Sequence, residues 1–273
     1  MPSISLIASV YNKVKEFEVL LLSLCNQTFK DFEVIAADDG SGPEIKKLIN
    51  EFKHRKLLDI KHVWHEDKGF RKNRILNKAI NASTADYLIF IDGDCLPKEN
   101  FISQHNKHKA MNTVLCGNRV DLGKKFSDKF IIEENKPGNS GQKILSLFWD
   151  SIKSKDDRST RVEEAIFIKS DLIHKIIRTK NPRLLGANFS IPKKLLEKIN
   201  GFDENYAGPG IGEDTDIEYR LKLAGAKFKS VRNKAILFHL YHNPLAIRND
   251  NLNYFEEVKK KKQYVCKNGL VKL

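Results

Sequence analysis

Apolar and amphipathic segments alternate along the first third of the chain. Four runs of apolar, β-branched and aromatic residues predict strands at 4–10, 32–41, 59–65 and 86–95. Between these runs, apolar residues recur at helical spacing over 16–27, 43–55 and 69–83. This alternation predicts an α/β fold with a mostly parallel central sheet and helices on both of its faces.

The second half of the chain is less regular. We expect a strand over 116–122, a loop over 123–143 and mixed helical spacing over 144–180. Short helices are expected over 193–202 and 214–226, ended by Gly201 and Gly225. A strand over 234–244 and a basic helix over 253–265 follow.

Acidic turns end two of the predicted strands. The first reads Asp38-Asp39-Gly40-Ser41, and the second reads Asp92-Gly93-Asp94. Ligands of open α/β sheets bind outside the carboxyl ends of the strands, so we expect both turns to face one crevice. Two aspartates spaced by one residue can hold Mg²⁺ or Mn²⁺ beside a diphosphate, and a carboxylate of the first turn can accept a hydrogen bond from a nucleobase or ribose. The alternatives are solvated turns or a helix N-cap.

The segment 208–216, GPGIGEDTD, combines glycines with a cluster of acids. Its glycines would let a substrate approach the backbone, and a carboxylate in a partly desolvated cleft can take a proton from a hydroxyl. The alternative is an ordinary complement to the dipole of the following helix.

Two histidines, His239 and His242, lie on the late predicted strand. Residues three apart on a strand point to opposite faces, so we expect only one of them to reach a site. Histidine is a common metal ligand beside carboxylates, and the alternative is a packed histidine without a ligand.

Composition limits the class of protein. The chain has 273 residues, 41% of them apolar, without a run long enough to span a membrane and without a signal-peptide pattern, so we expect a cytoplasmic protein. The four cysteines are scattered and indicate neither a zinc site nor a disulfide framework. The net charge of +13 has no nucleic-acid-binding motif beside it, and no nucleic-acid partner is expected. The lysines after Tyr254 form either a solvated face or a peripheral contact with the inner membrane.

Taken in order, these motifs resemble the family 2 glycosyltransferases with the GT-A fold. The matching segments are DDGS at 38–41, GFR at 69–71, DGDC at 92–95, GEDTD at 212–216 and the HxxH of the late strand. Residues 186–206, GANFSIPKKLLEKINGFDENY, resemble the members with a galactosyltransferase-type C-terminal module. The resemblance covers 3–122 and 184–245 and implies a Rossmann-like sheet flanked by helices, with a C-terminal acceptor-side module.

The resemblance also implies roles for individual residues. The nucleotide would contact Ser9, Tyr11, Asn12, Gly69, Phe70, Arg71, Asn77 and Asp92, and its base would contact Asp39, with Asp38 as the second choice. Mn²⁺ or Mg²⁺ would be held by Asp94, with Asp92 contacting metal or ribose and with His239, or else His242, as a late ligand. Asp214 would be the catalytic base, and Glu213 would hold the acceptor or donor sugar.

Three positions depart from the family pattern. Ser9 replaces a proline, and Leu76 replaces an arginine before Asn77, which removes an expected phosphate contact. Pro209 replaces a tryptophan of the acidic loop, which removes an aromatic platform for a sugar ring. The segment 123–183 matches no part of the family pattern and is interpreted as an insert of unknown role. It separates a nucleotide-sugar-binding half, 1–122, from an acceptor and catalytic-base module, 184–245. A basic tail, 246–273, follows.

The resemblance implies a metal-dependent inverting glycosyltransferase with a nucleotide-sugar donor, a UDP-sugar by expectation. The acceptor would be a glycan or a lipid-linked molecule of bacterial surface polysaccharide synthesis: capsule, O-antigen or lipopolysaccharide core. One alternative is a sugar-nucleotide nucleotidylyltransferase, although residues 8–18 lack the glycine-rich loop which that chemistry needs. The other is a basic membrane- or nucleic-acid-binding protein without catalysis.

Overall fold

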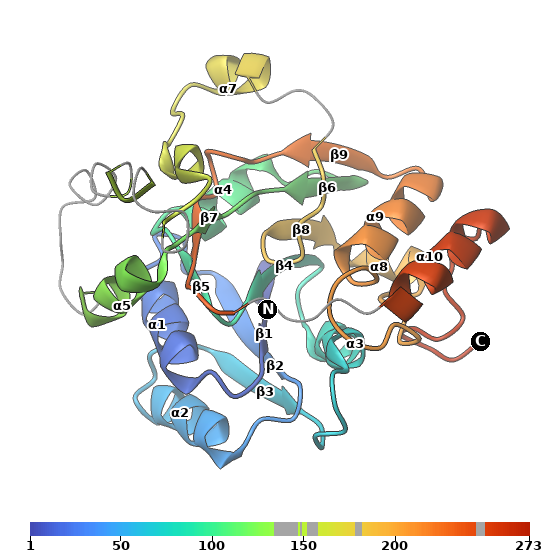
Figure 1. Ribbon diagram of the computed structural model, residues 1–273, viewed down its shortest axis with the longest axis horizontal. Helices are drawn as coiled ribbons and strands as arrows, with labels where there is room; N and C mark the ends of the chain where they lie inside the picture. Colours follow the sequence, from blue (N-terminus) through green and yellow to red (C-terminus); the bar gives the residue numbers. More distant parts are fainter. Residues whose placement is uncertain (134–146, 148, 152–157, 178–181, 244–248) are drawn as a thin grey trace.

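A seven-stranded sheet forms the centre of the molecule in this computed structural model, which describes the chain except residues 134–146, 148, 152–157, 178–181 and 244–248 (Figure 1). The strand order is β3-β2-β1-β4-β8-β6-β9. The first four strands pair in parallel, and β8 runs antiparallel to β4 and β6. The bounds are β1 Ile4–Val10, β2 Phe32–Asp38, β3 Ile60–Trp64, β4 Tyr87–Asp92, β6 Thr113–Cys116, β8 Phe189–Pro192 and β9 Lys227–Ser230. The predicted α/β fold with a mostly parallel sheet is confirmed.

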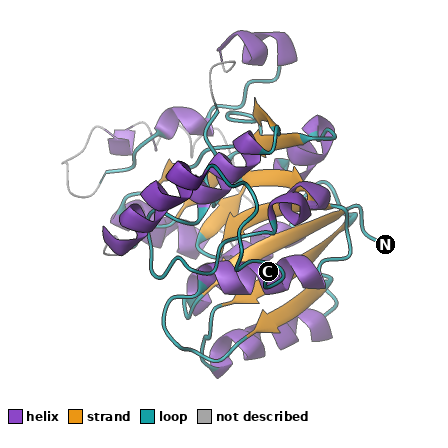
Figure 2. Ribbon diagram, turned by 90° about the vertical axis from the view of Figure 1, so that its right-hand side faces the viewer, coloured by secondary structure: helices purple, strands orange, loops and turns teal. Residues whose placement is uncertain are grey.

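Helices cover both faces of this sheet (Figure 2). On one face, α1 (Val14–Cys25) and α2 (Pro43–His54) bury Phe17, Leu20 and Ile45 against alternate strand residues. On the other, α3 (Lys72–Ala82), α8 (Lys193–Ile199) and α9 (Asp214–Leu223) pack against the remaining strand residues. The central strands are therefore apolar on both faces, which explains their nearly continuous apolar runs.

A second, three-stranded sheet has the order β5-β10-β7. Its strands are β5 (Cys95–Pro97), β10 (Leu237–His239) and β7 (Val120–Asp121). The expected strands over 86–95 and 116–122 are thus each split, because Asp94 and Gly117–Arg119 turn the chain from the large sheet into the small one. The register sets His239 opposite both Cys95 and Asp121, which brings three distant segments to one place.

Two further expectations for the second half need correction. Residues 124–133 form helix α5 (Lys124–Glu133) rather than a loop, and residues 134–143 of that predicted loop lie outside the described ones. The late strand is only three residues long, so His242 lies beyond it. The other elements are α4 (Phe101–His108), a 3₁₀ turn η1 (Val162–Ala165), α7 (Asp171–Ile177) and α10 (Asn249–Lys261).

The C-terminal residues pack back onto the domain. The backbone N–H of Cys266 donates to Ile199 O, and that of Leu270 donates to Asn200 O. Lys272 pairs with Glu204 at 2.7 Å. In the part of the chain that the structure describes, no helix combines the length and apolar character needed to cross a bilayer.

Candidate functional site

A pocket of about 580 Å³ lies where β1, β2 and β4 end. Segments from both halves of the chain line it: Ser9, Val10, Tyr11, Lys13, Asp39, Gly69, Phe70, Lys72, Asp92, Gly93, Asp94, Arg119, Pro209, Gly210, Glu213, His239, His242 and Asn243. The two acidic turns therefore face one crevice, as predicted. Most of the residues chosen from the sequence also line it.

The DGD turn is held against the end of β1. The N–H of Gly93 donates to Ser9 O at 2.7 Å, and a Cβ on Gly93 would lie 2.7 Å from the same oxygen. Only glycine fits this close approach without a shift of the backbone. The Ser9 hydroxyl also donates to Asp92 Oδ1 at 2.9 Å. The turn is therefore fixed with Asp92 and Asp94 both directed at the pocket.

Asp94, His239 and His242 form a group of three candidate metal ligands. Nε2 of His239 lies 3.6 Å from Asp94 Oδ1, and Nε2 of His242 lies 3.4 Å from Asp94 Oδ2. One ligand atom from each of the three residues falls within 4.8 Å of the others. The prediction that only one histidine reaches the site is wrong, because β10 ends at His239 and the chain beyond it turns back. A carboxylate with two imidazoles suits Mn²⁺ and other divalent ions, so the donor set fits a metal.

Cations already surround the acidic groups. Nζ of Lys13 lies 2.7 Å from Asp94 Oδ2, and Arg119 lies 3.7 Å from Asp92. Burial would raise the pKa of Asp94, but the close contact with the His239 ring and the charge of Lys13 hold that pKa far below its usual range. Burial lowers the pKa of His239, but the neighbouring carboxylates of Asp121 and Asp94 outweigh that effect, so its pKa is raised. Asp94 is therefore a negatively charged candidate ligand.

The two aspartates of the first acidic turn, Asp38 and Asp39, have different surroundings. Asp38 is fully buried and accepts hydrogen bonds from the backbone of Ser41 and, at 2.8 Å, from His62. Asp39 lines the pocket, where it meets His65 at 2.6 Å and the backbone N–H of Arg71 at 2.9 Å. Burial raises the pKa of Asp39, against the opposing effect of these partners. Asp38 thus holds the turn together, and Asp39 faces the pocket.

The segments beside Asp39 carry the other residues expected at the nucleotide. Tyr11 is half-exposed at the pocket, and its hydroxyl donates to Asp67 at 2.9 Å. Gly69 and Phe70 line the pocket directly. Asn12 and Arg71 do not line it: Oδ1 of Asn12 accepts from Gly42 N–H, and the side chain of Arg71 binds Glu66 O. These two residues connect the loops that form the rim.

Asn77 lies away from the pocket, although the family resemblance assigns it to the nucleotide. Its amide exchanges two hydrogen bonds with the backbone of Phe202, at 2.8 and 2.9 Å, and reaches Glu204 at 3.1 Å. The residue is only 3% exposed. Its position in the structure is that of a buried link between α3 and the loop after α8.

The acidic pair of the GEDTD segment lies beside the DGD turn. Glu213 lines the pocket, and its Oε1 lies 2.6 Å from Nζ of Lys72. The same ammonium lies 2.6 Å from Asp92, so Lys72 joins the DGD turn to the acidic pair. Burial raises the pKa of Glu213 to about 7, although Lys72 opposes the shift. Asp214 begins α9 beside Glu213, outside the lining residues, and accepts from the Gly186 N–H at 3.3 Å.

Sequence reasoning missed four charged residues of the site: Lys13, Lys72, Arg119 and Asp121. Asp121 lies 3.3 Å from Nδ1 of His239 and is held by Arg119 and Arg161. Lys72 follows the GFR motif directly, and Asp121 stands in the two-residue strand β7 after Gly117. Only the register of the small sheet shows that Asp121 meets His239.

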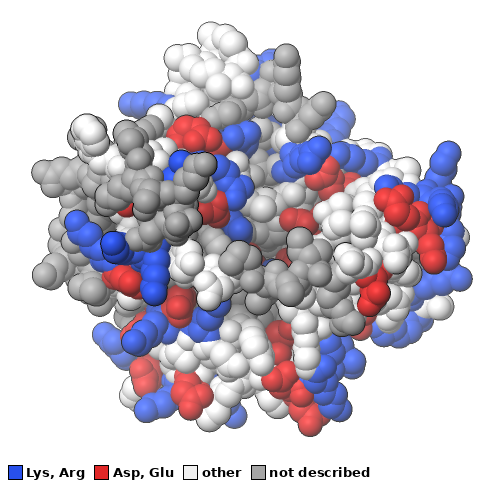
Figure 3. All heavy atoms as spheres, in the orientation of Figure 1, with Lys and Arg blue, Asp and Glu red and all other residues white. Residues whose placement is uncertain are grey.

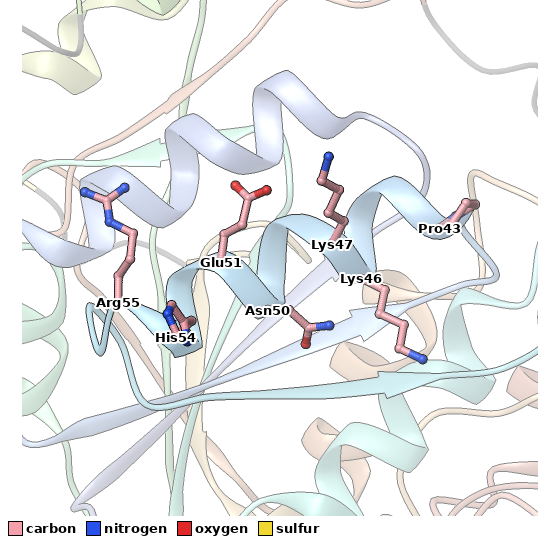
Figure 4. A pocket seen from close by; sticks show the side chains of 7 residues that line it. All are labelled: Pro43, Lys46, Lys47, Asn50, Glu51, His54 and Arg55. Carbon is pink, nitrogen blue, oxygen red and sulfur yellow. The ribbon is translucent and has the colours of Figure 1, made fainter.

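The rest of the surface offers no comparable group of ligands among the described residues. Basic and acidic side chains are interspersed over the face in Figure 3. A second hollow, on the outer side of α2, is lined by Pro43, Lys46, Lys47, Asn50, Glu51, His54 and Arg55. Figure 4 shows these side chains pointing in different directions along one helix, without a convergent set of ligands.

Family models match both halves of the chain. The model of glycosyl transferase family 2 matches residues 5–163, and the model described as the N-terminal domain of galactosyltransferase matches 170–243. A chondroitin synthase from Escherichia coli is 29% identical over 86% of this chain and 34% of its own length. A hyaluronan synthase from Pasteurella multocida is 26% identical over 84% of this chain and 24% of its own. The chain thus spans about a third or less of these curated relatives.

Solved structures resemble the fold. The 1–349 fragment of S. aureus TarS in complex with UDP-GlcNAc aligns with a TM-score of 0.62 at 16% identity, over 95% of this chain and 66% of that one. The mannosyltransferase PcManGT from Pyrobaculum calidifontis, in complex with GDP-Man and Mn²⁺, aligns with a TM-score of 0.57 at 14% identity, over 96% of this chain and 63% of that one. At these identities the likeness concerns the fold alone.

Proposed function

The chain belongs to glycosyl transferase family 2, and on that premise we propose that it is a metal-dependent inverting glycosyltransferase with a UDP-sugar as donor. The observation that carries the proposal is the single pocket in which Asp39, Asp92, Asp94, His239 and Glu213 meet. The complex of TarS with UDP-GlcNAc supports the choice of a UDP-sugar. The names of the chondroitin and hyaluronan synthases support a glycan acceptor in polysaccharide synthesis, and a lipid-linked acceptor of a bacterial surface polysaccharide belongs to the same proposal.

The donor would lie along the wall built from residues 1–122. Asp39 is placed to accept a hydrogen bond from the nucleobase, and Tyr11 and Phe70 offer aromatic surface beside it. Asp92 would bind ribose or metal. Asp94, His239 and His242 would hold Mn²⁺ or Mg²⁺, which neutralises negative charge on a diphosphate leaving group when bound.

The acceptor would approach from the side of residues 184–245. Asp214 takes the proton of the attacking hydroxyl, the oxygen forms a bond to the anomeric carbon, and the bond to the diphosphate breaks with inversion. Because Oε1 of Glu213 is engaged by Lys72, Glu213 is proposed to orient a sugar hydroxyl. A second candidate for the base is Glu213 itself, favoured by its place in the pocket and by its pKa of about 7.

A donor screen tests this function. The full chain is incubated with nucleotide sugars and Mn²⁺, and released nucleoside diphosphate is measured with and without glycan acceptors. The proposal expects release from a UDP-sugar, and an Asp214→Asn variant that binds donor but does not transfer. Transfer lost in Glu213→Gln and kept in Asp214→Asn would assign the base to Glu213. A chain that binds and turns over no nucleotide sugar would reject the proposed function.

The basic C-terminal segment adds a proposed contact with the inner membrane. Lys260, Lys261 and Lys262 are exposed around the end of α10, whereas Lys259 pairs with Glu256. Each basic residue near an anionic surface contributes about 1 kcal/mol. Such a contact would keep the enzyme close to a lipid-linked acceptor.

A further inference from the structure

Helix α7 turns its apolar side chains to the solvent. Leu172, Ile173, Ile176 and Ile177 are 70%, 51%, 72% and 55% exposed. Residues four apart lie on one face of a helix, so these four form a single stripe. Ile166, 44% exposed, comes shortly before them along the chain. Grouped exposed aliphatic residues of this kind are typical of an interaction surface.

Polar contacts fix the orientation of this helix. The Asp171 carboxylate accepts hydrogen bonds from Lys107 at 2.8 Å and from Lys234 at 2.5 Å. Lys234 is almost completely buried, and its ammonium also donates to Lys169 O. On the inner face, His174 is buried, and its Nε2 lies 2.8 Å from Arg232 O. The polar face of α7 is therefore anchored to the domain, and the apolar face stays outside.

The unpaired charges within the segment that carries the stripe, residues 166–177, are positive. Between Ile166 and Ile177 the only acidic residue is Asp171, and both of its oxygens are bound by lysines. Lys169 and Lys175 are exposed. In Figure 3 the lobe at the top, where Figure 1 places α7, is mostly white, with blue atoms and some red ones near its base. An apolar stripe flanked by lysines is complementary to a bilayer with anionic headgroups.

A second copy of the chain fits this surface less well. A stable protein interface buries about 800 Å² per partner, and two turns of helix with four aliphatic side chains expose far less. A bilayer needs no matching shape, since it accepts aliphatic side chains at the boundary of its headgroups and acyl chains.

We propose that α7 is a membrane-contacting element, which inserts Leu172, Ile173, Ile176 and Ile177 into the headgroup region of an anionic bilayer. Lys169 and Lys175 then lie at the level of the lipid phosphates. The contact is independent of the donor and the acceptor, and it differs from the one proposed for the end of α10.

Vesicle co-sedimentation of the full chain tests the proposal. Phosphatidylcholine vesicles with and without phosphatidylglycerol are compared at low salt. We expect binding to the anionic vesicles, and a loss of roughly tenfold or more in Leu172→Ser/Ile176→Ser, because two exposed aliphatic side chains are removed from the bilayer. Met111→Ser/Leu57→Ser removes two exposed apolar side chains elsewhere and should bind like the wild type.

The results of this experiment distinguish a bilayer from a second copy of the chain as the partner of the α7 stripe. Melting temperature and donor turnover should be unchanged in Leu172→Ser/Ile176→Ser, since neither side chain is buried or lines the pocket. Equal vesicle binding by this variant and the wild type would overturn the proposal, as would binding lost only in Lys260→Gln/Lys261→Gln. Absence of vesicle binding by the wild type, with a dimer that dissociates in Leu172→Ser/Ile176→Ser, would assign the stripe to a second copy instead.

Discussion

Nδ1 of His239 lies 3.3 Å from Oδ1 of Asp121, while Nε2 of the same ring faces Asp94 at 3.6 Å. Arg119 and Arg161 hold Asp121 from its other sides. A carboxylate on Nδ1 fixes the orientation of an imidazole and strengthens Nε2 as a ligand. Asp121 is therefore a positioning residue for the proposed metal site, contributed by the small sheet.

Replacing Asp121 should weaken metal binding without removing a ligand. In Asp121→Asn we expect the affinity for Mn²⁺ to fall about tenfold or more, because the ring loses its charged partner. Isothermal titration of the protein with Mn²⁺, without nucleotide, measures this. Asp59→Asn, at an exposed site outside the pocket, is the control. Equal Mn²⁺ affinity in Asp121→Asn and wild type would show that Asp121 does not position His239.

Lys72 should control the pH dependence of turnover. Its charge opposes the effect of burial on Glu213, whose pKa is about 7, so Lys72→Met should raise that pKa further. If Glu213 acts ionised, wild-type turnover falls as the pH drops through about 7, and in Lys72→Met this fall begins at a higher pH. Lys72→Arg should keep the wild-type pH–rate profile. Lys68→Met, which removes the exposed ion pair between Lys68 and Glu66, is the control. Superimposable pH–rate profiles for Lys72→Met and wild type would exclude this role.

Asn77 is predicted to act on stability and not on donor binding. Asn77→Ala removes hydrogen bonds to Phe202 and leaves buried backbone groups without partners, so we expect a loss of about 2–4 kcal/mol in the free energy of unfolding. The affinity for UDP, measured under native conditions, should remain unchanged. Asn81→Ala, on the exposed face of the same helix, should change neither. A variant with wild-type stability and weakened UDP binding would restore the nucleotide role that the family resemblance implies.

Glu33 should make the free energy of unfolding depend on pH in the acidic range. Burial alone would raise its pKa, but hydrogen bonds from Lys61, Ser5 and Thr84 lower it to about 2. Its folded-state pKa lies below the ordinary 4.5, so its contribution is complete above pH 4.5 and is lost as the pH falls towards 2. Glu33→Gln should therefore cost about 3 kcal/mol of unfolding free energy at neutral pH and progressively less in acid.

Urea unfolding at a series of pH values measures this difference. Glu51→Gln, on the exposed surface of α2, is the control and should follow the wild type throughout. A stability difference between Glu33→Gln and wild type that is constant with pH would contradict the prediction.

The sequence predicted the four parallel strands β1 to β4 of the large sheet because their signal is local, whereas β8 and β9 were not expected and β6 was expected only at its last residue. β1, β2 and β4 are buried on both faces, and the apolar runs of β2 and β4 stop where the carboxylates begin. The meeting of Asp39 with the DGD turn followed from parallel strand order alone, because the carboxyl ends of parallel strands share one edge.

What the sequence did not predict depends on contacts between distant segments. The small sheet joins strands of two or three residues from three separate places, too short to show a period. Its register brings Asp121 to His239, and the end of β10 lets His242 reach Asp94. In the sequence, nothing distinguishes Lys72 from other lysines at the start of a helix, because its contact with Glu213 joins two distant segments.

The most direct test of the central claim is donor hydrolysis or transfer with the metal removed and restored. We expect wild-type turnover of a UDP-sugar to fall by about a hundredfold or more in EDTA and to return with Mn²⁺, because the cation would neutralise the leaving group. Asp94→Asn should remain inactive in both conditions, while Asp31→Asn, an exposed control, behaves like the wild type. Wild-type turnover unaffected by EDTA, or full activity of Asp94→Asn, would contradict the account.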